Sequence, residues 1–271
     1  MRGPRLRLDL VAMNPLFERL VDDAGLFPPT SLHMDEALAR HRRDQESGNP
    51  VLTHRFLCPA SRLAGLRRES FVPERIGLIV DTEEIPDFSD LPVDFVEVRL
   101  PPHTGLAEHL ASGDVERTLA KLPPHVRLFV EVTPETHVGG LPERVGLKVR
   151  CGGMTPDAFP PAEHLGTFIR YCVDHDIPFK ATAGLHHAVR HFDPSLGVDR
   201  HGFLNLVLGV CEAVERRDPV PALRSTDVGG LVRMAQAVPE QTAKRARDLL
   251  VSYGSCSTHT PIEDLRTLGI L

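Results

Sequence analysis

Eight short apolar segments, bounded by glycine, proline or aspartate, recur along the chain and alternate with amphipathic stretches. They lie at residues 25–29, 54–59, 75–81, 95–101, 127–133, 145–151, 178–184 and 250–256. Between them, apolar residues recur at helical spacing, as in residues 34–38, 106–119, 165–172 and 203–214. A strand followed by a helix, repeated eight times in about 250 residues, is typical of a closed parallel barrel. We therefore predict an α/β fold, a (β/α)8 TIM barrel in which residues 1–271 form a single domain.

The pattern is weakest at three places. The first segment, residues 25–29, is short and rich in proline, and the connections after the third and fifth segments are too short or too polar for full helices. Residues from about 185 to 201 have the composition of a loop. Because this loop follows the seventh predicted strand, we expect it on the face of the barrel where active sites are built.

Composition excludes several classes of function. The formal net charge of -6 comes from charges of both signs mixed along the chain, so no basic stripe is present for nucleic acid. No apolar run reaches the ~20 residues that cross a bilayer, and Asp9 interrupts the segment where a secretory signal would be apolar. The five cysteines form no CxxC pair. We therefore expect a cytoplasmic protein with reduced thiols, no nucleic-acid partner and no membrane contact; a homo-oligomer stays open.

The choice of basic residues is unusual. Among 31 basic residues only Lys121, Lys148, Lys180 and Lys244 are lysine, and two of these lie in the middle of predicted strands. Arginine keeps its proton at any ordinary pH, whereas lysine can lose its proton and act as a nucleophile. A lysine retained inside a strand of this chain therefore invites a chemical explanation.

Charged residues alternate with apolar ones in four successive predicted strands. In FVEVRLP, Glu97 and Arg99 oppose Val96 and Val98. In the next three predicted strands, the residues that alternate with apolar ones in the same way are Glu131, Lys148, Arg150, Lys180 and Thr182. Strands of a barrel point alternate side chains to the interior and to the surrounding helices, and the helix-facing side is apolar. We therefore predict that these charged side chains meet inside the barrel.

Two lysines on adjacent strands can support covalent chemistry. One ammonium group depresses the pKa of its neighbour, and the freed amine can attack a carbonyl carbon to form a Schiff base. A nearby carboxylate then moves the protons. Lys148, Lys180 and Glu97 are accordingly the candidate catalytic residues. Two other interpretations stay open: a structural ion-pair network without catalysis, and an open sheet whose charged faces are solvated.

Several of these segments resemble the class I deoxyribose-phosphate aldolases, collinearly over most of the chain. FVEVRLP is similar to a family strand that carries a proton-transferring aspartate, which implies this role for Glu97. KVRCG is similar to the segment with the Schiff-base lysine, which implies Lys148 as nucleophile, and FKATAG to the segment with the second lysine, which implies Lys180. YGSCS is similar to a phosphate-binding segment, which implies Gly254, Ser255 and Ser257 in substrate binding. The resemblance also implies a barrel enzyme without a cofactor.

The chain departs from the family at two points. Where the family has paired glycines after its second lysine, this chain has Ala183 and Gly184, and Arg150 replaces a small hydroxyl residue. An added cation predicts a substrate with a carboxylate or another anionic group. Our hypothesis is therefore an aldolase-like lyase that forms a lysine Schiff base with a small anionic carbonyl compound. The expected substrate-binding residues, besides the YGSCS segment, are Arg99, Arg150, Glu131, Thr182, Arg55, His186 and His187.

Two other functions fit parts of the sequence. His186, His187, His191, His201 and His259 could bind a divalent metal together with Glu131 or Asp81, as in a metal-dependent hydrolase or isomerase, although their spacing matches no closed zinc motif. The chain could also be a small-molecule-binding barrel without catalysis. Cys256 has no histidine or asparagine beside it in the sequence, so we predict a small buried residue there. No residue is predicted to be a metal ligand.

Overall fold

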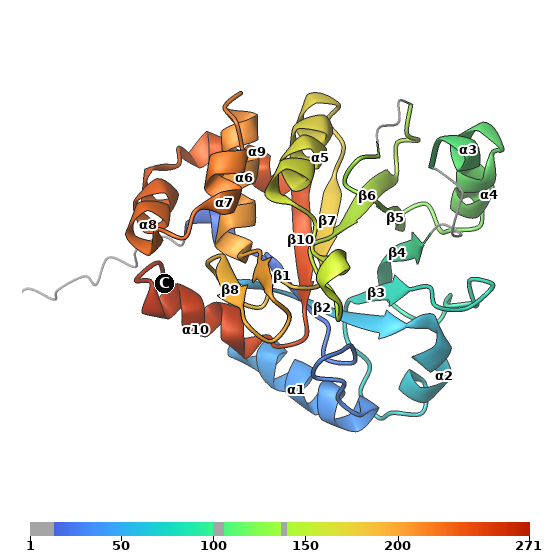
Figure 1. The fold of residues 1–271 in the computed structure, drawn as a ribbon. Coiled ribbons are helices and arrows are strands. Elements are labelled where there is room, and N and C mark those ends of the chain that lie inside the picture. The colour runs from blue at the N-terminus through green and yellow to red at the C-terminus, as the bar shows by residue number, and fades with distance from the viewer. Residues whose placement is uncertain (1–13, 100–105, 137–139) are drawn as a thin grey trace, which may run out of the picture.

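The structure, a computed structural model, describes residues 14–99, 106–136 and 140–271. Within these residues, parallel strands close into one barrel in the order β1-β2-β3-β4-β5-β6-β7-β10, with β10 pairing with β1 (Figure 1). The strands are β1 (Val21–Asp23), β2 (Leu52–Pro59), β3 (Ile76–Ile79), β4 (Val93–Arg99), β5 (Arg127–Val132), β6 (Val145–Arg150), β7 (Phe179–Thr182) and β10 (Leu250–Ser255). The predicted TIM barrel is confirmed.

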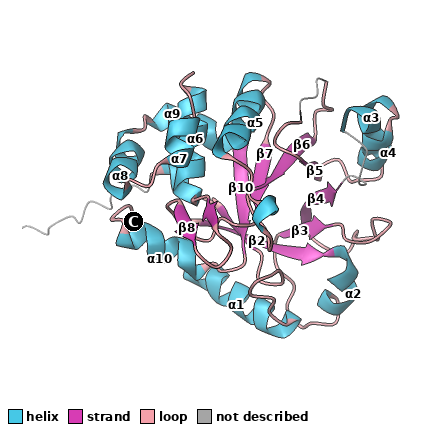
Figure 2. Ribbon diagram, in the orientation of Figure 1, coloured by secondary structure: helices cyan, strands magenta, loops and turns pink. Residues whose placement is uncertain are grey.

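Helices surround the strands (Figure 2). They are α1 (Met34–Ser47), α2 (Leu63–Leu66), α3 (Leu106–Ala111), α4 (Asp114–Ala120), α5 (Ala162–Asp174), α6 (Phe203–Val214), α7 (Val220–Arg224), α8 (Val228–Ala237), α9 (Glu240–Leu249) and α10 (His259–Thr267). The expected weak connections are confirmed: residues 80–92 after β3 contain no helix, and the described residues between β5 and β6 contain none.

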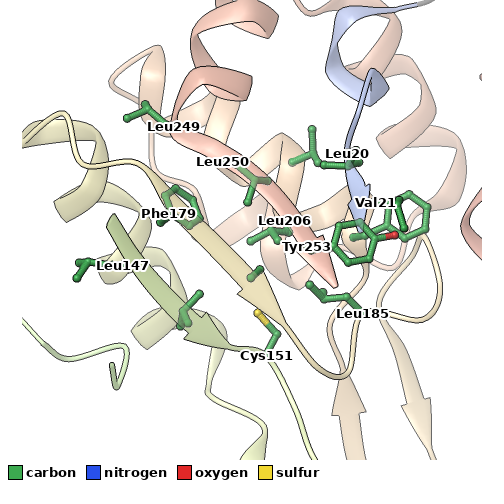
Figure 3. Close-up of a cluster of buried hydrophobic side chains, with 14 of the residues drawn as sticks. Leu20, Val21, Leu147, Cys151, Phe179, Leu185, Leu206, Leu249, Leu250 and Tyr253 are labelled. Atoms are coloured by element: carbon green, nitrogen blue, oxygen red, sulfur yellow. The ribbon is translucent and has the colours of Figure 1, made fainter. Parts of the chain in front are cut away.

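The apolar side chains that alternate along each strand point toward the helices and form the core between strands and helices. Leu147 of β6, Phe179 of β7 and Leu250 of β10 gather with Leu206 of α6 in one buried cluster (Figure 3). Phe179 packs edge-on against Phe168 of α5, with ring centroids 5.3 Å apart. Burial of each such side chain contributes about 1.5–3 kcal/mol. Because these side chains face the helices, the charged side chains at the alternate positions point into the barrel interior.

A small apolar cluster of Ala24, Leu57, Phe95 and Phe129 lies inside the barrel. The rings of Phe95 and Phe129 meet edge-to-face with centroids 5.5 Å apart. Gly146 makes room for them, because a Cβ atom there would lie 2.5 Å from the Phe129 ring. Phe95 lies two residues before Glu97 in β4, and Phe129 lies two residues before Glu131 in β5, so each pair points to the same side of its strand. The aromatic layer therefore lies beneath a layer of carboxylates.

Two predictions about local structure were wrong. The first strand is Val21–Asp23, and residues 25–29 form the turn that follows it. Pro28 and Pro29 lack the N–H groups that a strand within a sheet must donate, so this segment cannot pair on both sides. The loop at 185–201 contains an antiparallel hairpin of β8 (His191–Asp193) and β9 (Val198–Arg200).

Candidate active site

A pocket of about 600 Å³ opens at the carboxyl-terminal ends of the barrel strands. Its walls include residues of the turns after β1 (Phe27), β3 (Asp81) and β7 (Gly184), and of the hairpin strand β9 (Arg200). Active sites of TIM-barrel enzymes are built at this end of the barrel, from the loops that follow the strands. The pocket is therefore the candidate active site.

Lys148 contributes its amine to this pocket from β6. Its Nζ atom lies 2.5 Å from Oε2 of Glu97 and 3.1 Å from Oε2 of Glu131, and all three residues line the pocket. The Lys148 side chain is 7% exposed. Burial alone would lower the pKa of Lys148, but the two carboxylates outweigh burial and raise it. The resting side chain is therefore an ammonium group in contact with two groups that can accept its proton.

Lys180 lies opposite Lys148 in the register of β6 and β7 but is not among the residues that line the pocket. Its side chain is 1% exposed, forms an ion pair with Asp22 and donates a hydrogen bond to Oγ of Ser252 at 2.7 Å. Oε1 of Glu97 lies 3.6 Å from its Nζ atom. Burial lowers the pKa of Lys180, against the opposing effect of Asp22 and Glu97. The carboxylate of Glu97 thus bridges the two lysines that the sequence predicted to meet.

Asp22 anchors the buried end of this network. Its Oδ1 accepts hydrogen bonds from Oγ1 of Thr53 at 2.7 Å and Nη1 of Arg55 at 2.9 Å, and its Oδ2 accepts one from Oγ of Ser252 at 2.6 Å. Burial would raise the pKa of Asp22, but Lys180 and Arg55 outweigh it and lower the pKa. Asp22 was not among the predicted site residues because the first strand was predicted to begin after it, at residue 25. The adjacent acids in VDD, directly before a turn, were the available signal.

Arg99 and Arg150 are the last residues of β4 and β6, and they lie at the rim of the pocket. Nε of Arg99 lies 2.9 Å from Oε1 of Glu131, and Nη1 of Arg150 lies 3.8 Å from the same oxygen. The two side chains are 67% and 40% exposed, because both strands end here. Burial raises the pKa of Glu131, but Lys148, Arg99 and Arg150 outweigh burial and lower it. Both guanidinium groups can therefore reach an anion that enters the pocket.

Of the other predicted substrate-binding residues, Thr182, Gly254 and His186 line the pocket. Ser255 and Ser257 lie outside its lining, and Oγ of Ser255 donates a hydrogen bond to the backbone oxygen of Ser257 at 2.6 Å.

Two further candidates also lie outside the pocket lining. Arg55 is buried between Asp22 and Asp94, to which it donates hydrogen bonds of 2.9 Å each. His187 is exposed, with its Nδ1 atom 3.3 Å from Oδ2 of Asp264. Neither residue is among those that line the pocket, so their role in substrate binding stays a prediction.

The histidines that the sequence offers as metal ligands have different surroundings, although the rings of His187 and His191 lie with centroids 5.2 Å apart. His186 lines the pocket, whereas the His201 ring contacts the backbone oxygen of Pro160 at 2.7 Å and is buried. His191 contacts the backbone oxygen of Val189 at 3.0 Å. In residues 14–99, 106–136 and 140–271, no three histidine, cysteine or acidic side chains are placed to hold a metal ion. The geometry gives the metal-dependent alternative no support.

No protein-family model, curated protein or solved structure matches this chain. The aldolase resemblance is therefore limited to the motifs FVEVRLP, KVRCG, FKATAG and YGSCS. Within the described part of the chain, no helix is long and apolar enough to span a bilayer.

Proposed function

We propose that this chain is an aldolase-like lyase in which Lys148 forms a Schiff base with a small carbonyl compound that carries an anionic group. One observation carries the proposal. The amine of Lys148 lies in a pocket at the carboxyl-terminal end of a TIM barrel, in contact with the carboxylates of Glu97 and Glu131. Such a pocket is the usual place of catalysis in this fold.

The first half of the reaction needs the amine as a free base. As the carbonyl compound displaces water, the Lys148 ammonium passes a proton to Glu97, which is already in contact with it. The amine then attacks the carbonyl carbon, and the carbonyl π electrons move to oxygen. The oxygen then takes one proton from the attacking nitrogen and one from Glu97 and leaves as water, which gives an iminium ion between Lys148 and the carbonyl carbon.

The second half uses the iminium ion as an electron sink. When a base removes the proton of a hydroxyl group on the β carbon, a carbonyl forms there, the bond between the α and β carbons breaks, and its electron pair moves into an enamine. Glu131, in contact with Lys148, Arg99 and Arg150, is the proposed base. Protonation of the enamine and addition of water then restore Lys148. The same steps in reverse form the bond.

Lys180 has a positioning role in this scheme. It is held by Asp22 and Ser252 beneath the pocket, so it does not reach the substrate. Its Nζ atom, 3.6 Å from Oε1 of Glu97, orients that carboxylate so that the other oxygen faces Lys148. This differs from the expectation that one lysine would depress the pKa of the other, because two carboxylates raise the pKa of Lys148.

The pocket favours a small anion. Arg99 and Arg150 at the rim, and Arg200 on the hairpin wall, supply positive charge to a cavity of about 600 Å³. Guanidinium groups bind carboxylates and phosphates through paired hydrogen bonds. A carbonyl compound with a carboxylate, such as a 2-oxo acid, fits this set.

Enamine formation can be tested without knowing the natural substrate. In D2O, the native chain should exchange the methyl protons of pyruvate for deuterium, as followed by NMR. Lys148→Met should abolish the exchange, whereas Lys121→Met, at an exposed lysine, should leave it unchanged. Equal exchange by Lys148→Met would overturn the assignment of Lys148, and failure of every 2-oxo acid and small aldehyde in a panel would overturn the reaction class.

A further inference from the structure

Cys256 and His186 meet in the wall of the pocket. Cys256 follows β10 directly, and His186 lies in the turn after β7, the strand that pairs with β10. The Sγ atom of Cys256 lies 3.5 Å from Nδ1 of His186, and both residues line the pocket that contains Lys148. Cysteine and histidine at this distance are the two parts of an activated thiol nucleophile.

Both halves of the pair are fixed by the fold. The backbone oxygen of Cys256 accepts a hydrogen bond of 2.8 Å from Nη1 of Arg40, which belongs to α1. On the other side, the backbone N–H of Phe203 donates a 3.0 Å hydrogen bond to the backbone oxygen of His187, next to His186. The contact between thiol and imidazole is therefore set by the barrel and its helices rather than by a free loop.

The other cysteines have a different environment. None of them lines the pocket. Burial raises the pKa of Cys58, Cys151 and Cys211 to about 12, and it also raises the pKa of Cys172. Because the thiolate is the reactive form, we expect these four thiols to react slowly at neutral pH. Among the cysteines of the chain, Cys256 alone combines contact with the cavity and contact with an imidazole.

The imidazole is in the state that a base needs. Burial, and then the positive charge of Arg200, lower the pKa of His186. At neutral pH the ring is therefore neutral, and its Nδ1 atom can accept the thiol proton of Cys256.

We propose that Cys256 and His186 form a second nucleophilic site in this pocket, which adds reversibly to the carbonyl carbon of a small aldehyde. The thiol proton passes to His186 as sulfur bonds to carbon. The π electrons of the carbonyl group move to oxygen, which takes the proton from His186 to give a thiohemiacetal. The step needs no oxidant or reductant, and it does not require Lys148. β6 and β10 are separated by β7, so amine and thiol rise from strands about 10 Å apart.

Alkylation of the folded protein tests the nucleophile. Iodoacetamide, followed by peptide mass spectrometry, should label Cys256 at least tenfold faster than Cys58, Cys151, Cys172 or Cys211. His186→Gln should slow this labelling about tenfold, because the base is lost. His191→Gln, a control in the same insertion outside the pocket lining, should react as the native chain does. Equal labelling of another cysteine, or an unchanged rate in His186→Gln, would overturn the proposal.

Protection tests the carbonyl chemistry. Glyoxylate, a small anionic aldehyde, should slow alkylation of Cys256 in the native chain and in Lys148→Met, with Lys148→Arg as the alternative if the first variant does not fold. Glycolate, which has the same charge but an alcohol group in place of the aldehyde, should protect little. Absence of protection by glyoxylate, or equal protection by glycolate, would overturn thiohemiacetal formation. Because the test is also read at Cys256 in a variant without Lys148, its failure would not contradict the Schiff-base proposal.

Discussion

The Nζ atom of Lys148 lies 2.5 Å from Oε2 of Glu97 at the base of the pocket. In the resting protein this contact is an ion pair, and it keeps the pKa of the amine high. The same contact is the shortest route by which the amine can lose its proton when a carbonyl compound arrives. Whether the pair is catalytic or only structural therefore depends on chemistry at Lys148 that can be measured.

The carboxylate of Glu131, which contacts the Lys148 amine, should control how easily that amine loses its proton. Glu131→Gln removes one of the two negative charges that raise the pKa of Lys148, so that pKa should fall. The rate at which the protein captures pyruvate, measured by borohydride reduction across a pH series, should then reach half its maximum at a lower pH than in the native chain. A midpoint that stays in place or moves to higher pH would argue against this electrostatic control.

Asp22 should be important for stability rather than for substrate contact. Asp22→Asn leaves the buried Lys180 without its closest counter-charge, and loss of one partner of a buried ion pair costs about 3–5 kcal/mol. The free energy of unfolding in urea should fall by this order. Asp94→Asn is the matched control, since Asp94 also pairs with Arg55 but is partly exposed. This variant should lose clearly less free energy of unfolding than Asp22→Asn. An equal decrease in the two variants would contradict the account.

The contribution of Asp22 should also depend on pH in a defined direction. Because its pKa is lowered in the folded protein, its charge stabilises the fold above the pKa of an unfolded aspartate, about 3.9. As the pH falls below about 4, this contribution should decrease by about 1.4 kcal/mol per pH unit. The stability difference between native chain and Asp22→Asn should therefore shrink in acid. A difference that is constant from neutral to acid pH would contradict the lowered pKa.

Arg150 should select anionic substrates. Arg150→Gln should weaken capture of pyruvate about tenfold, or ~1.4 kcal/mol, and leave capture of neutral acetone nearly unchanged. Arg127→Gln is the control, because Arg127 begins β5 at the opposite end of the barrel and is exposed. The ratio of the two capture constants is the measurement, and a ratio unchanged by Arg150→Gln would remove the anion-binding role.

The parity of the strands made the barrel and much of the pocket predictable. Apolar residues such as Leu147 and Phe179 mark the helix-facing side, so Lys148, Lys180 and Glu97 had to face inward, and they lie there together. Alternation in a strand is a local signal, and the closure of a parallel barrel turns it into a shared interior. Only residues within correctly placed strands benefit from this reasoning.

Contacts between residues far apart in the sequence could not be predicted from strand alternation. Placing the first strand after Asp22 concealed this residue, and its ion pair with Lys180 joins two residues that are 158 positions apart in the sequence. His186 and Cys256 are seventy residues apart, and only the pairing of β7 with β10 brings them together. Arg99 has the predicted parity but lies at the rim, because parity gives the side of a strand and not the depth at which the strand ends.

Borohydride trapping on the native chain tests the Schiff base at Lys148 most directly. Incubation with pyruvate or another small 2-oxo acid, reduction, and peptide mass spectrometry should give one adduct, at Lys148, with the matching mass increase. Lys180 should stay unmodified because Asp22 and Ser252 enclose its amine. Adducts distributed over Lys121 and Lys244, or found at Lys180 in place of Lys148, would contradict the account.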